Sequence, residues 1–149
     1  MALIIRILVA RGHRVLISSY THSAVDNLLL KLLEAGVSTS DLIRLGSASG
    51  IIHPQILPIV LDQSNCSSQQ LLKTKFESGR IIACTVLAAA RNILLQGNIF
   101  DWCIMDEAGQ ISQPAAIGAL HYCNKFLLVG DDYQLPPLIV SLEAKSLVL

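Results

Sequence analysis

Short apolar runs recur along the chain and are separated by stretches in which polar and apolar residues mix. Four of these runs are unbroken by charge, and a fifth contains a single arginine. Runs of this length without alternation are typical of parallel β-strands that are covered on both faces. The pattern therefore predicts five strands, at Val15–Ser19, Leu42–Leu45, Ile81–Val86, Trp102–Met105 and Phe126–Val129.

Helical periodicity is clearest in residues 24–35. Six apolar side chains recur there at offsets of four and form one face, and Asp26 belongs to the polar residues of the other face. Ser23 and Asp26 have the spacing of a capping box, which places the start of the helix at Ser23. Gly36 is predicted to end this helix, because glycine readily adopts the left-handed conformation at a helix C-terminus.

Two further segments are predicted to be helical, and one is predicted to be irregular. Residues 2–11 form the end of an apolar helix that Gly12 closes, and residues 69–78 form another helix. Residues 46–68 are rich in Ser, Gly, Pro and Gln, so we expect a loop with broken helix. Strands that alternate with helices imply an α/β fold in which helices flank a parallel sheet.

The composition narrows the class of protein. A chain of 149 residues has about the length of one domain, so we assign residues 1–149 to one domain with a loop and helical insertion at residues 46–80. Hydrophobic residues make up 52% of the chain, and eleven Lys and Arg balance eleven Asp and Glu. This composition excludes a disordered chain and a strongly basic nucleic-acid binder.

Neither a membrane span nor a metal-binding cysteine cluster is predicted. The longest stretches without a charged residue are 17 residues long, at 45–61 and 108–124, and both contain Gly, Pro and several polar side chains. A spanning helix needs about 20 mostly apolar residues, so we expect no contact with a membrane. The cysteines lack metal-ligand spacing and are predicted to be reduced thiols of a cytosolic or nuclear protein: Cys66, Cys84, Cys103 and Cys123.

Two of the predicted strands end in pairs of carboxylates. Asp106 and Glu107 follow one apolar strand directly, and Asp131 and Asp132 follow Gly130 at the end of the next. Ligands of open α/β sheets bind outside the carboxyl ends of the strands, so both pairs would face one crevice. Charges beside buried strands are costly, which favours a metal or catalytic role, although each pair taken singly also fits a structural turn. In a nucleotide hydrolase, the strand-end Asp holds Mg²⁺ and the Glu accepts a proton from the attacking water.

Three segments, in order, resemble motifs of superfamily 1 helicases. Residues 19–27 (SYTHSAVDN) resemble motif Ia, residues 106–110 (DEAGQ) resemble motif II, the Walker B motif, and residues 130–137 (GDDYQLPP) resemble motif III. Together with residues 111–114 (ISQP), they are most similar to the family of eukaryotic DNA replication ATP-dependent helicase/nucleases. The resemblance implies a RecA-like P-loop NTPase domain that uses ATP and Mg²⁺, within a single-stranded DNA translocase and helicase that is also a flap nuclease.

The resemblance also implies which residues form the nucleotide site. Asp106 would coordinate the Mg²⁺ of Mg-ATP through water, and Glu107 would be the catalytic base. Gly130 would allow a tight turn of the backbone beside the phosphates. Gln134, with Asp131, would couple the γ-phosphate to the DNA-binding surface.

On the DNA side, Thr21, His22 and Ser23 would contact the backbone of single-stranded or flap DNA. A helix N-terminus after a strand offers free N–H groups to phosphate, which makes this location suitable. Helix capping is an equal alternative for Ser23, and the two roles can coexist. Thr85 resembles a second DNA-contacting threonine. The family further implies a single-strand-binding protein as partner and a nuclear location, with the mitochondrion as an alternative.

The chain departs from the family pattern in three positions and in one motif. Gly109 replaces a small Ser or Ala, Ala89 replaces a Gly after the threonine strand, and Asp132 stands where His is usual and adds negative charge beside the phosphate site. No glycine is followed by lysine, so a Gly-Lys-Ser/Thr phosphate loop is absent from these 149 residues. We therefore expect a partial RecA-like domain that lacks the phosphate-loop strand, the second RecA-like domain, the nuclease domain and the family's iron–sulfur cluster.

Two other functions stay open at this point. A superfamily 1 RNA helicase of the RNA-surveillance type would share the same motifs, although the wording of residues 20–27 argues against it. A short non-catalytic protein that binds DNA or a helicase partner would need none of the nucleotide chemistry. We expect the isolated chain to neither bind ATP tightly nor hydrolyse it, because the phosphate loop supplies most phosphate contacts.

Overall fold

The computed structural model describes residues 1–46, 53–62, 68–131, 133, 135–139, 141 and 143. A parallel sheet of six strands lies at its centre, in the order β3-β2-β4-β1-β5-β6, and every neighbouring pair is parallel. The predicted α/β class is therefore confirmed. The strands are β1 (Val15–Ser19), β2 (Leu42–Leu45), β3 (Val60–Leu61), β4 (Ile81–Thr85), β5 (Phe100–Met105) and β6 (Cys123–Leu128).

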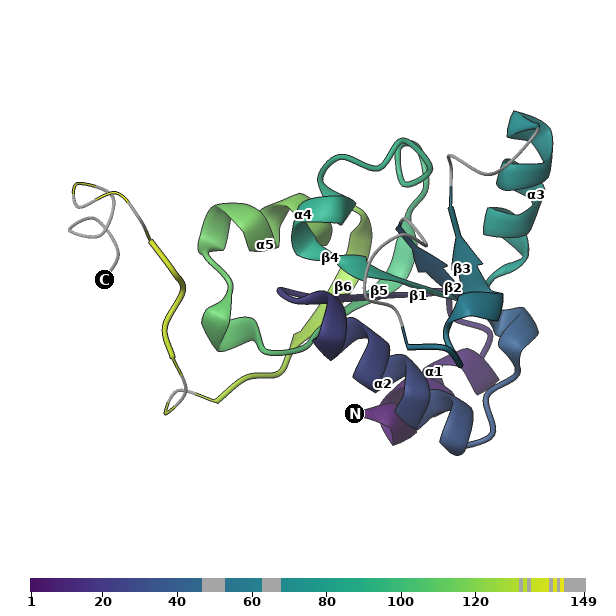
Figure 1. The fold of residues 1–149 in the computed structure, drawn as a ribbon, viewed down its shortest axis with the longest axis horizontal. Coiled ribbons are helices and arrows are strands. Elements are labelled where there is room, and N and C mark those ends of the chain that lie inside the picture. Colours follow the sequence, from purple (N-terminus) through teal and green to yellow (C-terminus); the bar gives the residue numbers. More distant parts are fainter. Residues whose placement is uncertain are drawn as a thin grey trace.

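Helices cover both faces of the sheet, as Figure 1 shows. One face packs against the first two helices and the other face against the last three, and each layer closes its own hydrophobic cluster. Alternate residues of β1 enter opposite clusters, because Val15 and Ile17 lie in one and Leu16 in the other. The helices are α1 (Ala2–Ala10), α2 (His22–Glu34), α3 (Gln69–Ser78), α4 (Val86–Ala89) and α5 (Gln113–Leu120).

The strand predictions are confirmed in the sheet interior and less accurate at its edges. β1 and β2 have the predicted bounds, and β4 is one residue shorter than predicted. β5 and β6 begin two and three residues before the predicted starts. β3 was not predicted, because its two residues lie inside the Pro-rich and Gly-rich segment that was assigned to a loop. Of the predicted loop 46–68, residues 47–52 and 63–67 lie outside the described residues.

The prediction that every strand is covered on both faces is wrong for β6. This strand lies at the edge of the sheet and pairs only with β5 among the described residues. On one face of this strand, Phe126 is 58% and Leu128 46% exposed, whereas Leu127 packs against the cluster on the other face. β1, in contrast, is buried at every position. β6 thus forms an edge of the sheet and carries exposed apolar side chains.

The start of α2 also differs from the prediction. Thr21, not Ser23, is the N-cap, and its Oγ1 accepts a hydrogen bond from the Ala24 N–H at 3.2 Å. Ser23 lies inside the first turn. Asp26, which periodicity assigns to the polar face, is buried with 4% of its surface exposed. Gly36 follows the helix with a φ of 83°, as the predicted C-terminal signal requires.

Two predicted absences can be compared with the described residues. Within them, no helix is long and apolar enough to cross a membrane. The thiols of Cys84, Cys103 and Cys123 are free, and Cys66 lies outside the described residues. Burial raises the pKa of the Cys84 thiol to about 12, so this group stays protonated at neutral pH.

Candidate functional site

The predicted site residues lie at the carboxyl ends of four neighbouring strands. Backbone hydrogen bonds hold these ends together beyond the strands themselves. The Asp106 N–H donates to the Ser18 carbonyl at 2.9 Å, the Val129 N–H to the Met105 carbonyl at 2.9 Å, and the Ala108 N–H to the Val129 carbonyl at 2.8 Å. The segment after β5 is therefore clamped between the ends of β1 and β6.

This clamp brings the two predicted carboxylate segments together. A cavity of about 220 Å³ is lined by residues from both: Asp106, Glu107, Val129, Gly130 and Asp131. The expected crevice at the strand ends is thus present, and we refer to it as the acidic pocket. The remaining residues predicted for this site, Asp132 and Gln134, lie outside the described residues.

Glu107, which lines this pocket, has an unusual backbone conformation. Its φ of 54° and ψ of 38° lie in the left-handed region, where no other non-glycine residue of the described chain is found. Such a conformation costs roughly 1–2 kcal/mol and tends to occur at functional sites. The Glu107 N–H donates to Asp106 Oδ1 at 3.0 Å, and the Ser19 hydroxyl donates to Glu107 Oε2 at 3.5 Å. Both carboxylates are partly exposed and are thus accessible to a ligand.

Ser19 is a site residue that sequence reasoning missed. It is fully buried at the end of β1, and its hydroxyl joins this strand end to the carboxylate of Glu107. Two residues later, Thr21 begins the predicted DNA-contacting segment. Ser19 therefore lies between the two halves of the predicted site. The available signal was a hydroxyl residue at the end of the strand next to the one that carries Asp106 and Glu107. Recognising this signal requires knowledge of the strand order.

Glycines at positions 109 and 130 allow the two segments of the pocket to approach each other. A Cβ atom at Gly130 would lie 2.7 Å from the Gly109 nitrogen, and a Cβ atom at Gly109 would lie 3.1 Å from the Asp131 carbonyl oxygen. Neither glycine has a positive φ. Glycine is thus required at position 130 because two backbones pack closely there, and not because of the tight turn that we expected.

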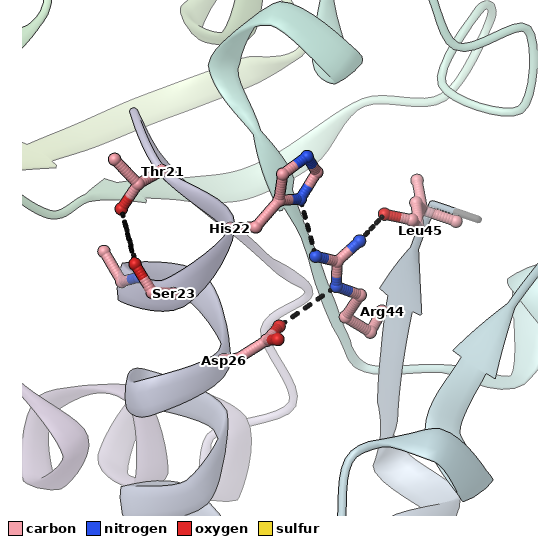
Figure 2. A network of polar contacts seen from close by, with 7 residues as sticks. Thr21, His22, Ser23, Asp26, Arg44 and Leu45 are labelled. Carbon is pink, nitrogen blue, oxygen red and sulfur yellow. Dashed lines mark hydrogen bonds and ion pairs between the residues drawn. The ribbon is translucent and has the colours of Figure 1, made fainter. Parts of the chain in front are cut away.

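The predicted DNA-contacting segment lies at the N-terminus of α2, after the end of β1. Figure 2 shows the Thr21 and Ser23 hydroxyls bonded to each other, with Oγ1 and Oγ 3.2 Å apart. His22 and Ser23 are exposed, and Thr21 is half-buried. The capping alternative for Ser23 is wrong, because Thr21 is the cap. The hydroxyl of Ser23 therefore lies at the surface of the first helical turn.

Thr85 occupies the same position on the neighbouring strand β4, where it aligns with Ser19 of β1. It caps α4, and its Oγ1 accepts a hydrogen bond from the Ala88 N–H at 3.3 Å. Only 6% of its surface is exposed. The cap uses the hydroxyl only as an acceptor and leaves its proton to donate, so it is the low exposure of Thr85 that disfavours the expected DNA contact. Ala89, which replaces a Gly of the family pattern, is fully buried, so its methyl group packs in the core.

A buried ion pair lies directly beneath the segment that is predicted to contact DNA, and this ion pair was not predicted. Arg44 Nε donates to Asp26 Oδ1 at 3.1 Å, and their side chains are 1% and 5% exposed. The same guanidinium contacts His22 Nδ1 and the carbonyl of Leu45 (Figure 2). A Cβ atom at Gly46 would collide with the Arg44 guanidinium. The signal in the sequence was an arginine inside an otherwise apolar strand.

The chain resembles known proteins in both fold and sequence. An Asp-Glu pair at the end of an inner strand of a parallel sheet is typical of the RecA-like class of nucleotide hydrolases. Two solved structures share the fold with a TM-score of 0.56 each. One is the arterivirus nonstructural protein 10 helicase with DNA, at 15% identity over 91% of this chain and 27% of that one. The other is the C-terminal part of the Fun30 ATPase domain, at 18% identity over 96% and 45%.

Residues 62–142 match the protein family described as "AAA domain", and the chain belongs to this family. Among curated proteins, it is 45% identical over 138 residues to the DNA replication ATP-dependent helicase/nuclease DNA2 of Saccharomyces cerevisiae. It is 43% identical over 149 residues to DNA2 of Homo sapiens, and 40% identical over 142 residues to the Arabidopsis thaliana protein of the same description, JHS1. These similarities confirm the resemblance that the motifs indicate.

The match covers nearly all of this chain and a small part of its relatives. It includes 91% of the chain and 9% of the yeast protein, 97% and 14% for the human protein, and 95% and 10% for the Arabidopsis protein. The chain therefore corresponds to one segment of these long proteins. What the whole relatives do is carried to this chain only as a proposal.

Proposed function

We propose that this chain forms the part of an ATP-driven single-stranded DNA helicase that carries the Mg²⁺ ligand, the catalytic base and a DNA-contacting segment. The observation that supports this most strongly is the acidic pocket, where Asp106 and Glu107 face Gly130 and Asp131 at the carboxyl ends of adjacent strands. The relatives described as DNA replication ATP-dependent helicase/nucleases support the substrate class. Substrates of the whole protein are then single-stranded and flap DNA, with a single-strand-binding protein as partner and the nucleus as location.

The composition of the acidic pocket fits Mg²⁺ that arrives with a nucleotide. The described residues contain no group of three His, Cys, Asp or Glu that could hold a metal ion by themselves. Mg²⁺ is commonly bound by one or two carboxylates together with substrate phosphates, so a single strand-end Asp is sufficient. One oxygen of Asp106 accepts the Glu107 N–H, and the other makes no hydrogen bond within the described part of the chain. When bound, Mg²⁺ neutralises charge between the terminal phosphates.

Glu107 is the proposed general base of the reaction. Its carboxylate would accept a proton from the attacking water, and this role needs an oriented carboxylate near the γ-phosphate. The left-handed backbone of Glu107 and the contact with Ser19 Oγ determine that orientation. Asp131 and Gln134 are proposed to couple the phosphate site to the DNA surface. Asp131 Oδ1 accepts the Tyr133 N–H at 3.0 Å.

The DNA-contacting segment is proposed to comprise Thr21, His22 and Ser23. Its position supports this role, because the first turn of α2 combines free backbone N–H groups with exposed polar side chains. Contacts of this kind position the phosphate backbone and need no basic surface, which is consistent with a formal net charge of zero. Thr85 is left out of the direct contacts because of its burial.

We further propose that a phosphate-loop strand completes the nucleotide site at the β6 edge. The chain contains no Gly-Lys pair, so it lacks the backbone cradle and the lysine that hold phosphates in this class. β6 presents exposed apolar side chains on the side of the acidic pocket, and parallel strands are normally covered. A strand at this edge would pair with the backbone of β6, and its own side chains would cover part of Phe126 and Leu128. It would also bring a phosphate loop towards Asp106.

The experiment that tests the proposed function compares nucleic acids as activators. ATP hydrolysis by the full-length protein that contains this segment is measured alone, with single-stranded DNA and with single-stranded RNA of the same sequence. We expect stimulation by DNA and little by RNA. Stimulation by RNA alone would favour an RNA helicase, and hydrolysis that no nucleic acid changes would contradict the proposal.

A further inference from the structure

The guanidinium of Arg44 makes three contacts, two with α2 and one with its own strand β2. Arg44 lies on β2 and is 1% exposed. Its Nε lies 3.1 Å from Asp26 Oδ1, its Nη1 lies 2.8 Å from the Leu45 carbonyl oxygen, and its Nη2 lies 2.7 Å from His22 Nδ1. Each of its three nitrogens thus has a partner. Two of these partners, His22 and Asp26, lie one turn apart on α2, so the contacts attach the first turn of this helix to the sheet.

Stability alone is a weak reason for such an arrangement. Replacing a buried ion pair by apolar side chains of similar volume is often neutral or stabilising, because removing two charges from water is costly. The third contact of the guanidinium is the informative one. It reaches an exposed histidine that the DNA-contacting segment contains. The geometry therefore connects a buried structural pair to a surface residue with a proposed role.

The contact with Arg44 determines which nitrogen of His22 carries the proton. A guanidinium has only donors, so His22 Nδ1 must accept, and the proton of the neutral ring resides on Nε2. Figure 2 shows this second ring nitrogen on the far side of the ring from Arg44. His22 therefore presents one N–H donor at the exposed end of α2, beside the hydroxyls of Thr21 and Ser23.

We propose that Arg44 and Asp26 are positioning residues that hold His22 as a neutral Nε2–H donor to a phosphate oxygen of single-stranded DNA. Asp26 orients the guanidinium, and the guanidinium selects the tautomer and the direction of the imidazole. This proposal rests on the proposed function of the segment Thr21–Ser23. To that function the proposal adds one feature: the donor is a single neutral N–H, and the buried Arg44 and Asp26 determine its direction.

The first test compares two replacements of His22 that differ in where they place a donor. Glutamine places its amide N–H close to the position of Nε2, and asparagine places it close to that of Nδ1. Affinity of the full-length protein that contains this segment for a fluorescein-labelled oligo-dT is measured by anisotropy. We expect His22→Gln to stay within about threefold of the wild type and His22→Asn to bind about tenfold more weakly, the loss of one hydrogen bond. Equal affinity of the two variants would overturn the proposal.

The second test asks whether Arg44 acts through His22. Arg44→Lys keeps the charge but loses the planar fork, so we expect binding to weaken by about tenfold in the wild-type background. In the His22→Asn background, the same change should weaken binding by less than about twofold, because residues that act through one contact are not additive. A further tenfold loss in the double variant would show that Arg44 does not act through His22. Asp26→Asn replaces Arg44→Lys in this comparison if the lysine variant fails to fold.

A spectroscopic measurement tests the tautomer directly. In a chain labelled with ¹⁵N on histidine, the His22 signals should show an unprotonated Nδ1 and a protonated Nε2, and Arg44→Lys should produce a mixture of tautomers. A protonated Nδ1 in the wild type would overturn the proposal. Thr21→Ala separates this inference from the proposed function. If it weakens binding and His22→Asn does not, only the inference fails; if the wild type does not bind oligo-dT, both fail.

Discussion

At the scale of single residues, the pocket depends on backbones that pack without side chains between them. Gly130 and Gly109 lie in one contact between the segments that follow β6 and β5. The two positions differ in how much space they leave. A Cβ atom at Gly130 would approach backbone nitrogen to 2.7 Å, whereas a Cβ atom at Gly109 would be 3.1 Å from the nearest backbone oxygen.

Gly130→Ala is expected to lower the free energy of unfolding by about 1–3 kcal/mol, because overpacking forces a backbone to move. Gly109→Ala is the matched control and should cost less than about 1 kcal/mol, since the smaller overlap is partly offset by a less flexible unfolded chain. Urea denaturation of both variants measures the difference. Equal destabilisation by the two alanines would contradict the assigned contact.

The cysteines allow a second prediction at the residue scale. Burial raises the pKa of Cys84 to about 12, whereas a hydrogen bond from Cys103 lowers the pKa of Cys123, which is only partly buried. Only the thiolate reacts with disulfide reagents, so Cys123 should react first at pH 8 in a Cys66→Ser variant. Labelling followed by peptide mapping checks this order. Labelling of Cys84 as fast as Cys123 in the folded chain would refute it.

At the scale of elements, the start of α2 shows how local rules compete. Ser23 and Asp26 satisfy the capping-box spacing, but Thr21 is the residue with an extended backbone before the helix, and it forms the cap. Asp26 takes no part in capping α2, and its side chain pairs with Arg44 in the interior. Periodicity placed it in solvent, since a charged residue is ordinarily exposed, and the ion pair with Arg44 overrides that tendency.

This assignment predicts different stabilities for two similar substitutions. Thr21→Ala removes the side chain that accepts the Ala24 N–H and should destabilise the fold by about 1 kcal/mol. Ser23→Ala removes a surface hydroxyl and should change stability by less than about 0.5 kcal/mol. Thermal unfolding of the two variants provides the comparison. A larger loss for Ser23→Ala would restore the capping box.

The sheet shows which elements the sequence could predict. β1 and β2 have their predicted bounds because polar residues flank their continuous apolar runs. β3 has two residues and was hidden among turn-forming residues. The exposed side of β6 was also unpredictable, because an edge strand can carry the same apolar pattern as an inner strand and only the strand order separates them.

At the scale of the whole molecule, the strand order assembles the proposed site. Four neighbouring strands lie in the order β4-β1-β5-β6. β4 ends at Thr85, and the other three end shortly before Thr21, Asp106 and Gly130 in turn. The proposed nucleotide half and the proposed DNA half therefore both lie at the carboxyl ends of these strands, and Ser19 lies between them. The motifs propose which residues belong to the site, and the structure brings Asp106, Glu107, Gly130 and Asp131 to one pocket. The links through Ser19 and Arg44 depend on contacts between strands and helices distant in sequence, which no local pattern records.

The uncovered edge at β6 leads to a prediction for the 149-residue chain. Without a Gly-Lys phosphate loop, the acidic pocket offers mainly negative charge to a nucleotide. The chain should therefore bind Mg-ATP with a Kd well above the micromolar range. Isothermal titration measures this, and a micromolar Kd would contradict a partial nucleotide site.

The central claim is that Glu107 is the base that activates water in an ATP-driven helicase. The most direct measurement is steady-state ATP hydrolysis with single-stranded DNA by the full-length protein carrying Glu107→Gln, alongside its nucleotide affinity. Glutamine keeps the size and polarity of the side chain but cannot accept the proton, so kcat should fall by about 10²–10⁴-fold. Mg-ATP binding should change little, because Asp106 and the phosphate loop hold the nucleotide. A kcat that stays near the wild-type value would contradict the account.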